Sequence, residues 1–295
     1  MFAAVLPFPN IGPEIFSIDL GGFHLALRWY ALAYIAGILI GWRLILQTLN
    51  SPQLWPAQTA PMNSEHLEAM LTWLVLGIIA GGRLGFVFFY QPAYYLSNPL
   101  QIPMVWQGGM SFHGGFLGVV LAVWFFSRHH KLHVPSIADA LAFATPAGLM
   151  LGRISNFINA ELWGRPSEAP WAVIFPGEQA QNCPGVLELC ARHPSQLYEA
   201  ALEGLLLGTL LLFLVWRRDW LKKPGQITGL FFAGYGVSRF IVELFRQADN
   251  QFITPDNPMG YVLSAGNMGL SMGQLLSLPM IIVGVLVIAW ARRRV

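Results

Sequence analysis

Seven long runs of hydrophobic residues alternate with shorter polar connections along this chain. Each run comes close to the length of about 20 apolar residues that an α-helix needs to cross a bilayer. The pattern therefore predicts an all-α integral membrane protein with seven transmembrane helices in a single domain, residues 1–295. The predicted spans are residues 25–46, 66–89, 112–127, 136–153, 198–216, 227–246 and 272–291.

Two of the connections, residues 90–111 and 154–197, are too long to be simple turns. They contain Trp106, Trp163 and Trp171, and tryptophan is enriched where a membrane meets water. We therefore expect these segments to form partly amphipathic interfacial arms and a loop region on the outer, periplasmic face.

Composition narrows the class of protein further. Only 11% of the 295 residues are charged, against about 25% in ordinary soluble domains. The formal net charge is +2, without the clustered basic face that nucleic-acid binding needs. We therefore exclude a soluble domain and a nucleic-acid partner. The segment from Met1 to Ser17 lacks a basic region and a small-residue cleavage site, so we expect no removable signal peptide.

Basic residues in the connections predict the orientation, because lysine and arginine are retained on the cytoplasmic side of a membrane. One side has only Arg28, Arg165 and Arg192. With seven crossings, this asymmetry places the N-terminus outside and the C-terminus in the cytoplasm. The other side collects ten basic residues: Arg43, Arg128, Lys131, Arg217, Arg218, Lys222, Lys223, Arg292, Arg293 and Arg294.

Charged side chains inside the spans form a second pattern. Arg83, Arg153, Arg239 and Arg246 all fall in the outer half of outward-running spans, and His113 opens the third span at the same depth. An arginine near the bilayer centre costs about 2.5–3.5 kcal/mol on insertion scales, so such a residue usually faces a cavity or a partner. We therefore expect a polar site towards the outer leaflet.

One face of the sixth span is polar. Tyr235, Arg239, Glu243 and Arg246 follow one another at spacings i, i+4, i+8 and i+11, which stacks them along one side of a helix. This ridge indicates a functional site. The alternative is an ion pair of Glu243 with either arginine that only holds helices together.

The stretch from Gly152 to Arg165, after the fourth span, is unusually rich in hydrogen-bonding side chains. It contains Arg153, Asn156, Asn159 and Glu161. Two amides, a carboxylate and an arginine exceed what the capping of a helix end requires, so we expect a ligand or water there. A polar helix end with its caps is the alternative.

Three other features admit a structural explanation as well as a functional one. His113 is followed by glycines that let another backbone or a lipid headgroup approach closely. The segment from His193 to Glu199 fits a proline-marked helix start with Ser195 as its cap. Cys183 and Cys190 would form a local disulfide if their loop faces an oxidising compartment.

Together these motifs resemble one family, the bacterial prolipoprotein diacylglyceryl transferases. The signature Gly-Arg-x-small-Asn-Phe-x-Asn-x-Glu-x-x-Gly, residues 152–164, is highly specific for that family. The resemblance covers nearly the whole chain. Its other segments are Arg28 to Tyr30, Gly81 to Arg83, His113 to Gly115, His193 to Glu199, and Gly234 to Arg246.

This resemblance implies a transferase of the bacterial inner membrane that moves the diacylglyceryl group of phosphatidylglycerol onto the lipobox cysteine of a preprolipoprotein. The products would be a thioether-linked lipoprotein precursor and glycerol phosphate, in the first step of lipoprotein maturation. Its partners would be these two substrates and membrane lipids. By similarity, the functional residues are Tyr30, His113, Arg153, Asn156, Glu161, Gly164, Arg239 and Glu243, with Arg153 binding the phospholipid.

The chemistry of the residues fits this reaction. Arg153 and Arg239 suit a phosphodiester, because a planar guanidinium donates in parallel to two oxygens. Either His113 as general base or the positive charge nearby would yield the reactive thiolate. No metal or nucleotide cofactor is expected. The catalytic candidates are His113, Arg239, Glu243 and Tyr30, and the substrate-binding candidates are Arg153, Asn156, Asn159, Glu161, Gly164, Tyr235 and Arg246.

Two other classes of protein compete with the transferase. A transporter predicts polar groups that continue to the inner face of the membrane, and Asp139, in the inner half of the fourth span, is the main residue of that kind. A lipid-binding scaffold would hold phosphatidylglycerol without releasing glycerol phosphate when it is given a cysteine peptide.

Overall fold

The structure is a computed structural model that describes residues 5–183, 189–265 and 268–293. Arg294, one of the basic residues in the predicted charge asymmetry, lies outside the described residues. So do the first four residues of the N-terminal segment and five residues of the predicted 154–197 connection, numbers 184–188. The chain divides into two compact units, of which the first is Met1–Leu44 with Leu141–Val295 and the second is Ile45–Ala140.

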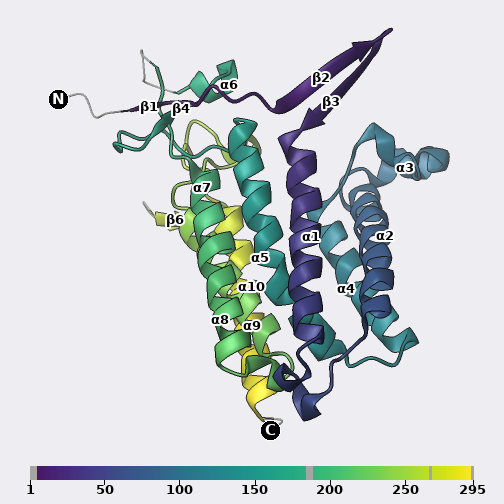
Figure 1. The fold of residues 1–295 in the computed structure, drawn as a ribbon. Helices are drawn as coiled ribbons and strands as arrows, with labels where there is room; N and C mark the ends of the chain where they lie inside the picture. The colour runs from purple at the N-terminus through teal and green to yellow at the C-terminus, as the bar shows by residue number, and fades with distance from the viewer. Residues whose placement is uncertain (1–4, 184–188, 266–267, 294–295) are drawn as a thin grey trace. The chain divides into compact units, whose positions relative to one another are not determined.

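Each hydrophobic run of the sequence contains a helix (Figure 1). Within the described residues, five helices are long and apolar enough to cross a membrane, namely α1, α2, α5, the continuous helix from α7 to α8, and α10. The protein is therefore mostly helical and crosses the membrane several times. The bounds are α1 (Trp29–Leu49), α2 (Ser64–Phe89), α4 (Phe112–His129), α5 (Val134–Ile158), α7 (Ser195–Glu199), α8 (Leu207–Arg217), α9 (Gln226–Val242) and α10 (Met272–Arg293).

Two helices, α4 and α9, are not among these five. α9 has only 17 residues, and α4 begins with a histidine and two glycines in its first turn and ends on Arg128 and His129. A π-helical segment, Ala200–Leu206, joins α7 to α8. The remaining helices are short: α3 (Pro92–Ser97), α6 (Glu178–Gln181) and 3₁₀ turns at Pro52–Leu54, Pro56–Gln58, Pro99–Gln101, Val105–Gln107, Trp220–Lys222 and Asn250–Phe252.

The described residues also contain short strands, which the all-α prediction did not include. An antiparallel hairpin of β2 (Glu14–Leu20) and β3 (Phe23–Arg28) pairs Ser17 with Ala26. Because β3 takes up residues to Arg28, α1 begins at Trp29 rather than near residue 25. Two smaller sheets pair β1 (Leu6–Pro7) in parallel with β4 (Val173–Ile174), and β5 (Leu263–Ala265) antiparallel with β6 (Met268–Leu270).

The polar face of this hairpin carries ion pairs. His24 Nδ1 lies 2.7 Å from Asp19, and Arg28 lies 3.3 Å from Glu14. The hydrogen bonds to the Asp19 and Glu14 carboxylates raise the pKa of the exposed His24 imidazole above its ordinary value. The charged side chains of the hairpin therefore pair with one another, outside the predicted transmembrane spans.

Glycines bring α2 and α4 into close antiparallel contact in the second unit (Figure 1). A Cβ atom on Gly114 would collide with the backbone of Gly81 and Gly85, and one on Gly118 would collide with Gly77. Small residues spaced four apart let membrane helices approach in this way. The neighbour that the glycines after His113 admit is therefore the backbone of α2.

Glycines also mediate the contact between α9 and α10 in the first unit. Gly229 approaches the backbone of Gly284, and Gly236 approaches Ser277, which makes the two helices antiparallel. In the same unit, Gly37 of α1 lies against Gly148 of α5. The contacts of Gly229 and Gly236 pack α9, which carries Tyr235 and Arg239 of the predicted polar face, against α10.

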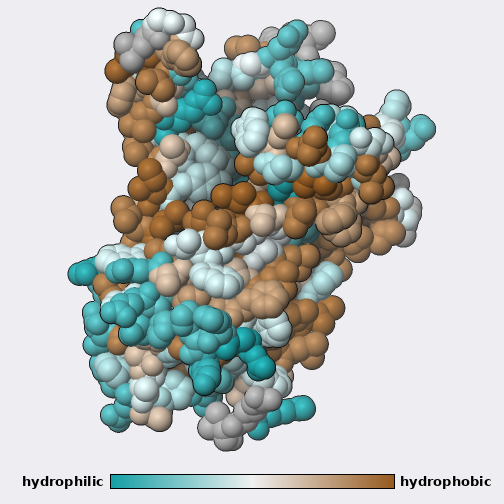
Figure 2. All heavy atoms as spheres, turned by 90° about the vertical axis from the view of Figure 1, so that its right-hand side faces the viewer, coloured by the Kyte–Doolittle hydropathy of each residue, from teal (hydrophilic) through white to brown (hydrophobic). Residues whose placement is uncertain are grey.

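Large apolar side chains cover much of the outer surface of the helices, as the brown areas in Figure 2 show. On α2 and α4, Leu76 is 61% exposed and Leu121 is 51% exposed. Exposed apolar patches of this extent are unusual on soluble proteins. They are the surfaces expected to face lipid.

Candidate active site

Three arginines converge on one buried carboxylate in the first unit. Glu199 of α7 lies 3.0 Å from Nε of Arg153, which projects from α5. The same carboxylate pairs with Nη1 of Arg239 on α9 and lies 3.2 Å from Nη1 of Arg246, just beyond that helix. Three segments distant in sequence therefore meet at Glu199.

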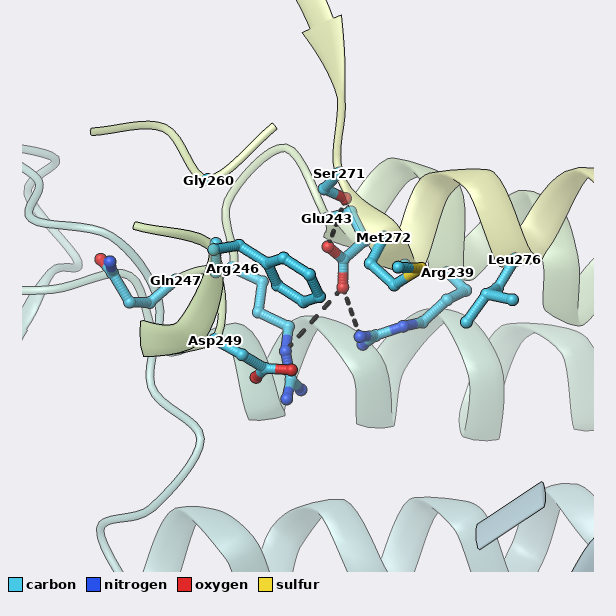
Figure 3. Close-up of a pocket in the computed structure, with 12 residues that line it drawn as sticks. Arg239, Glu243, Arg246, Gln247, Asp249, Gly260, Ser271, Met272 and Leu276 are labelled. Atoms are coloured by element: carbon cyan, nitrogen blue, oxygen red, sulfur yellow. Dashed lines mark hydrogen bonds and ion pairs between the residues drawn. The ribbon is translucent and has the colours of Figure 1, made fainter. Parts of the chain in front are cut away.

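Glu243 forms the second centre of this cluster (Figure 3). Its Oε1 pairs with Nη2 of Arg239 and lies 3.8 Å from Nε of Arg246. Its Oε2 accepts a hydrogen bond of 2.7 Å from the Ser271 hydroxyl, which precedes α10. The two ion pairs that the sequence offered as alternatives for Glu243 are therefore both present.

The carboxylates of the cluster are more deeply buried than its arginines. The side chains of Glu199 and Glu203 are fully buried, whereas those of Arg153, Arg239 and Arg246 are 20%, 17% and 14% exposed. A guanidinium has five N–H donors, so each arginine retains donors beyond those facing the carboxylates. The cluster can therefore still bind an anion, such as a phosphate, on its accessible side.

The signature segment closes on itself at the end of α5, which runs to Ile158 and not only to the predicted residue 153. The side-chain amide of Asn156 donates to Glu161 over 2.7 Å, and that of Asn159 donates to the same oxygen over 3.4 Å. Ala160 and Leu162 both have left-handed backbone conformations, with φ of 53° and 58°. Such angles are uncommon for residues other than glycine and concentrate at functional sites. The predicted binding residues Asn156, Asn159 and Glu161 therefore form one network.

Gly164 ends the signature at a place with no room for a side chain. Its N–H donates to the carbonyl of His193 over 2.8 Å, and the N–H of Arg165 donates to Phe245 over 2.8 Å. A Cβ atom on Gly164 would collide with both of these backbone carbonyls. The predicted role of Gly164 therefore has a structural explanation, since it lets the segment before α7 lie against the end of α9.

Replacing Gly164 by alanine is expected to separate His193 from Phe245 and so to displace Arg246. We expect the transfer activity that the resemblance implies to fall about tenfold or more, and the unfolding free energy to fall by about 1–3 kcal/mol, the usual cost of overpacking. Activity of the purified variant and its thermal unfolding in detergent would measure both. Gly12→Ala offers the matched control, because Gly12 is exposed and a Cβ atom there makes only an ordinary contact of 3.9 Å with the Glu14 carbonyl.

A buried arginine connects the cysteine loop to the signature. Arg192 donates to the carbonyls of Ala180 and Gly164 over 2.6 and 3.3 Å, and its guanidinium lies 4.1 Å from the ring centre of Trp163. Burial lowers the pKa of this guanidinium from its ordinary value. Cys183 and Cys190 form a disulfide in the same loop.

Both tyrosines predicted to contribute to the site lie in the first unit. The Tyr34 hydroxyl donates to that of Tyr30 over 3.3 Å, and Arg153 and Glu161 are close enough to act electrostatically on Tyr34. Tyr235 is partly buried on α9 and lies within electrostatic range of Arg153. Both tyrosines therefore lie in the same unit as the arginine cluster.

Two other polar residues of the predicted layer belong to the second unit. His113 is exposed at the second residue of α4, where its ring meets the Phe112 ring edge to face. Arg83 is buried, and its guanidinium donates to the backbone carbonyls of Gln101, Ile102, Gly108 and Gly109. Arg83 therefore holds the loop between α3 and α4.

Sequence reasoning named neither of two further carboxylates of the cluster as a site residue. It placed Glu199 at the outer end of the fifth span, in a segment that a helix start also explains, and did not consider Glu203, whose carboxylate lies 3.8 Å from Arg153. The signal was their spacing of four residues in an apolar span, which places both on one helical face. The interpretation of Ser195 as a cap is wrong, because Ser195 is the first residue of α7 and its hydroxyl donates to the Leu162 carbonyl over 3.0 Å.

The fold and this site define a class of protein: a mostly helical, multi-pass membrane protein with a buried cluster of arginines and carboxylates that can bind an anion. The profile of the prolipoprotein diacylglyceryl transferase family matches residues 14–290. The chain belongs to this family, as its motifs predicted.

Similar proteins cover the chain almost completely. A phosphatidylglycerol-prolipoprotein diacylglyceryl transferase of Ruegeria pomeroyi is 65% identical over 289 residues, which cover 98% of each chain. Proteins of the same name from Cereibacter sphaeroides and Rhizobium meliloti are 60% and 48% identical, over 98% of this chain and 98% and 95% of the respective relative.

Proposed function

We propose that this protein transfers the diacylglyceryl group of phosphatidylglycerol to the lipobox cysteine of a preprolipoprotein, the first step of lipoprotein maturation. The observation that carries the proposal is the cluster of Arg153, Arg239 and Arg246 around Glu199, in a membrane protein of this family. A phospholipid that reaches this cluster presents an anionic phosphodiester to three guanidinium groups. The enzyme names of the relatives state the same two substrates.

The reaction exchanges one bond for another at the glycerol carbon. The thiolate sulfur attacks the carbon that carries the phosphate, and a C–S bond forms as the C–O bond breaks. The phosphate oxygen keeps the bonding electrons and leaves as glycerol phosphate. In our proposal Arg153 and Arg239 bind the phosphate and stabilise the charge that develops on it, while Glu199 and Glu243 hold the arginines in position.

The other predicted residues keep their proposed roles. Asn156 and Asn159, linked through Glu161, would position headgroup hydroxyls or the peptide backbone, and Tyr30 and Tyr235 would do so from α1 and α9. Gly164 holds the segments around Arg246 together. These assignments rest on the family signature and on the contacts within the first unit.

We further propose seven crossings, with the N-terminus outside, the C-terminus in the cytoplasm and the active site towards the outer leaflet of the inner membrane. The asymmetry of the basic residues supports this orientation. The Cys183–Cys190 disulfide supports it as well, because disulfides persist in oxidising compartments such as the periplasm. The segments 90–111 and 154–197 would then lie outside.

Incubation of the purified protein with phosphatidylglycerol and a lipobox peptide tests the reaction. Mass analysis should find a diacylglyceryl adduct on the peptide cysteine, and the adduct should be lost with Arg153→Ala. Bound phospholipid without release of glycerol phosphate would support the scaffold instead. Movement of lipid across the bilayer without an adduct would support the transporter.

The predicted role of His113 has its own test. If His113 removes the thiol proton, His113→Gln should lower the transfer rate about 10²–10⁴-fold, the usual contribution of general base catalysis. The loss should shrink at high pH, where the thiol, with pKa about 8.5, ionises without a base. Because His113 is exposed on α4, the variant should keep its thermal stability. A near-normal rate would remove the base assignment and leave the charge of the arginines as the cause of thiol ionisation.

A further inference from the structure

A cavity of about 150 Å³ adjoins the arginine cluster in the first unit (Figure 3). Arg239, Glu243 and Arg246 form part of its lining. The rest comes from the loop after α9, with Asp249 and Phe252, and from the first turns of α10. The cavity therefore adjoins Arg239, one of the two arginines that bind the phosphate in the proposed function.

The size of the cavity suits a small headgroup. A cavity of about 150 Å³ in another protein accommodates benzene, a molecule of six heavy atoms. Glycerol also has six heavy atoms. The glycerol headgroup of phosphatidylglycerol is bonded to the phosphate itself, so it must occupy space next to the groups that hold the phosphate.

The lining also suits a polyol. Phe252, Met272 and Leu276 provide apolar surface for its C–H groups. Asp249 contributes an exposed carboxylate, whose oxygens make no hydrogen bond or ion pair with any part of the chain that the structure describes. A carboxylate only accepts hydrogen bonds, and its two oxygens can accept from both hydroxyls of a vicinal diol. A cationic headgroup would instead meet the guanidinium groups of Arg239 and Arg246.

We propose that this cavity is the subsite for the glycerol headgroup of the donor lipid and that Asp249 recognises its two free hydroxyls. Asp249 is then a specificity residue for the transfer reaction. This inference rests on the proposed function. It adds which part of the donor lipid is recognised and by which side chain.

Two donor lipids of equal charge test the subsite. Phosphatidylglycerol and phosphatidylpropanol carry the same phosphodiester, but only the first has headgroup hydroxyls. The wild-type protein should prefer phosphatidylglycerol about ten- to a hundredfold in kcat/KM, as expected for hydrogen bonds to a charged group. Asp249→Ala should bring this ratio close to one. The ratio cancels any effect of the substitution on folding or on the net charge of the site.

Asp256→Ala is the matched control, because Asp256 is an exposed acid seven residues further along that is not part of the cavity lining. It should leave the ratio unchanged. An unchanged ratio in Asp249→Ala, or no preference in the wild-type protein, would overturn the subsite while leaving the transfer reaction intact. If the wild-type protein transferred the diacylglyceryl group from neither lipid, the proposed function itself would be contradicted.

Free glycerol phosphate has the same chemistry as the lipid headgroup and is the expected product. Its inhibition of transfer should also weaken in Asp249→Ala if the leaving group stays in the subsite. If Asp249→Ala weakened this inhibition but left the ratio of kcat/KM for the two lipids unchanged, the cavity would bind only the released product. That result would overturn the proposal.

Discussion

Replacing Arg239 by alanine is expected to reduce diacylglyceryl transfer by about a thousandfold. Arg239 pairs with Glu199 through one terminal nitrogen and with Glu243 through the other, so its guanidinium bridges the two carboxylates. Removing one preorganised donor to a developing anion costs about 10²–10³ in rate. Misplacement of the remaining arginines adds to this loss. Initial rates of adduct formation on a lipobox peptide would measure it.

Arg239→Lys separates charge from geometry. Lysine keeps the positive charge but lacks the planar fork that donates to two partners. The variant should therefore retain the fold, and it should regain only a small part of the activity that Arg239→Ala loses. Arg218→Ala provides the matched control, because Arg218 is an exposed arginine beyond the C-terminal end of α8 and its loss should leave the rate unchanged. An Arg239→Ala enzyme with more than a tenth of the wild-type rate would contradict the proposed phosphate site.

Glu199→Gln should cause the second large effect. Glu199 is fully buried and contacts Arg153, Arg239 and Arg246, whereas glutamine carries no charge to balance them. Breaking a buried ion pair by removing one partner costs about 3–5 kcal/mol, so the thermal unfolding temperature should fall clearly. Without Glu199 the arginines repel one another and separate, and we expect the transfer rate to fall about a hundredfold.

Glu68→Gln makes the same chemical change at an exposed position of α2 and should alter neither quantity. Glu199→Asp restores the charge on a shorter side chain. It should therefore restore more of the thermal stability than of the transfer rate. If Glu199→Gln unfolded at the wild-type temperature, the cluster would not be a buried ion-pair network. If it kept the wild-type rate, Glu199 would not position the arginines.

The helices were largely predictable because hydrophobic length is a local property of the chain. α10, for example, begins at Met272 as predicted and ends at Arg293, two residues after the predicted end. The start of α1 was less predictable, since the apolar residues from Phe23 to Leu27 serve equally well in a strand. The pairing of that strand with residues 14–20 decided the outcome, and such pairing depends on a second segment.

Part of the site was also predictable. A charged residue inside an apolar span stands out at once, and helical spacing predicts Arg239, Glu243 and Arg246 on one face. The helix ends at Val242 rather than at the predicted residue 246, and ion pairs with Glu199 and Glu243 hold Arg239 and Arg246 together. The same reasoning placed Arg83 in the functional layer, although its guanidinium binds four backbone carbonyls of a loop. The cost of burying an arginine is the same whether its partner is a substrate or a loop.

The membrane class, the position of the helices and the family thus follow from the linear sequence, because hydropathy, charge and a contiguous signature are all read along one segment. Only the tertiary structure reveals that Glu199, from the start of one helix, collects arginines from two other segments, and that a cavity opens beside them. Ion pairs and cavities depend on the distances between segments far apart in sequence. Those distances are set by how the helices pack, through contacts such as Gly164 with Phe245 and Gly229 with Gly284.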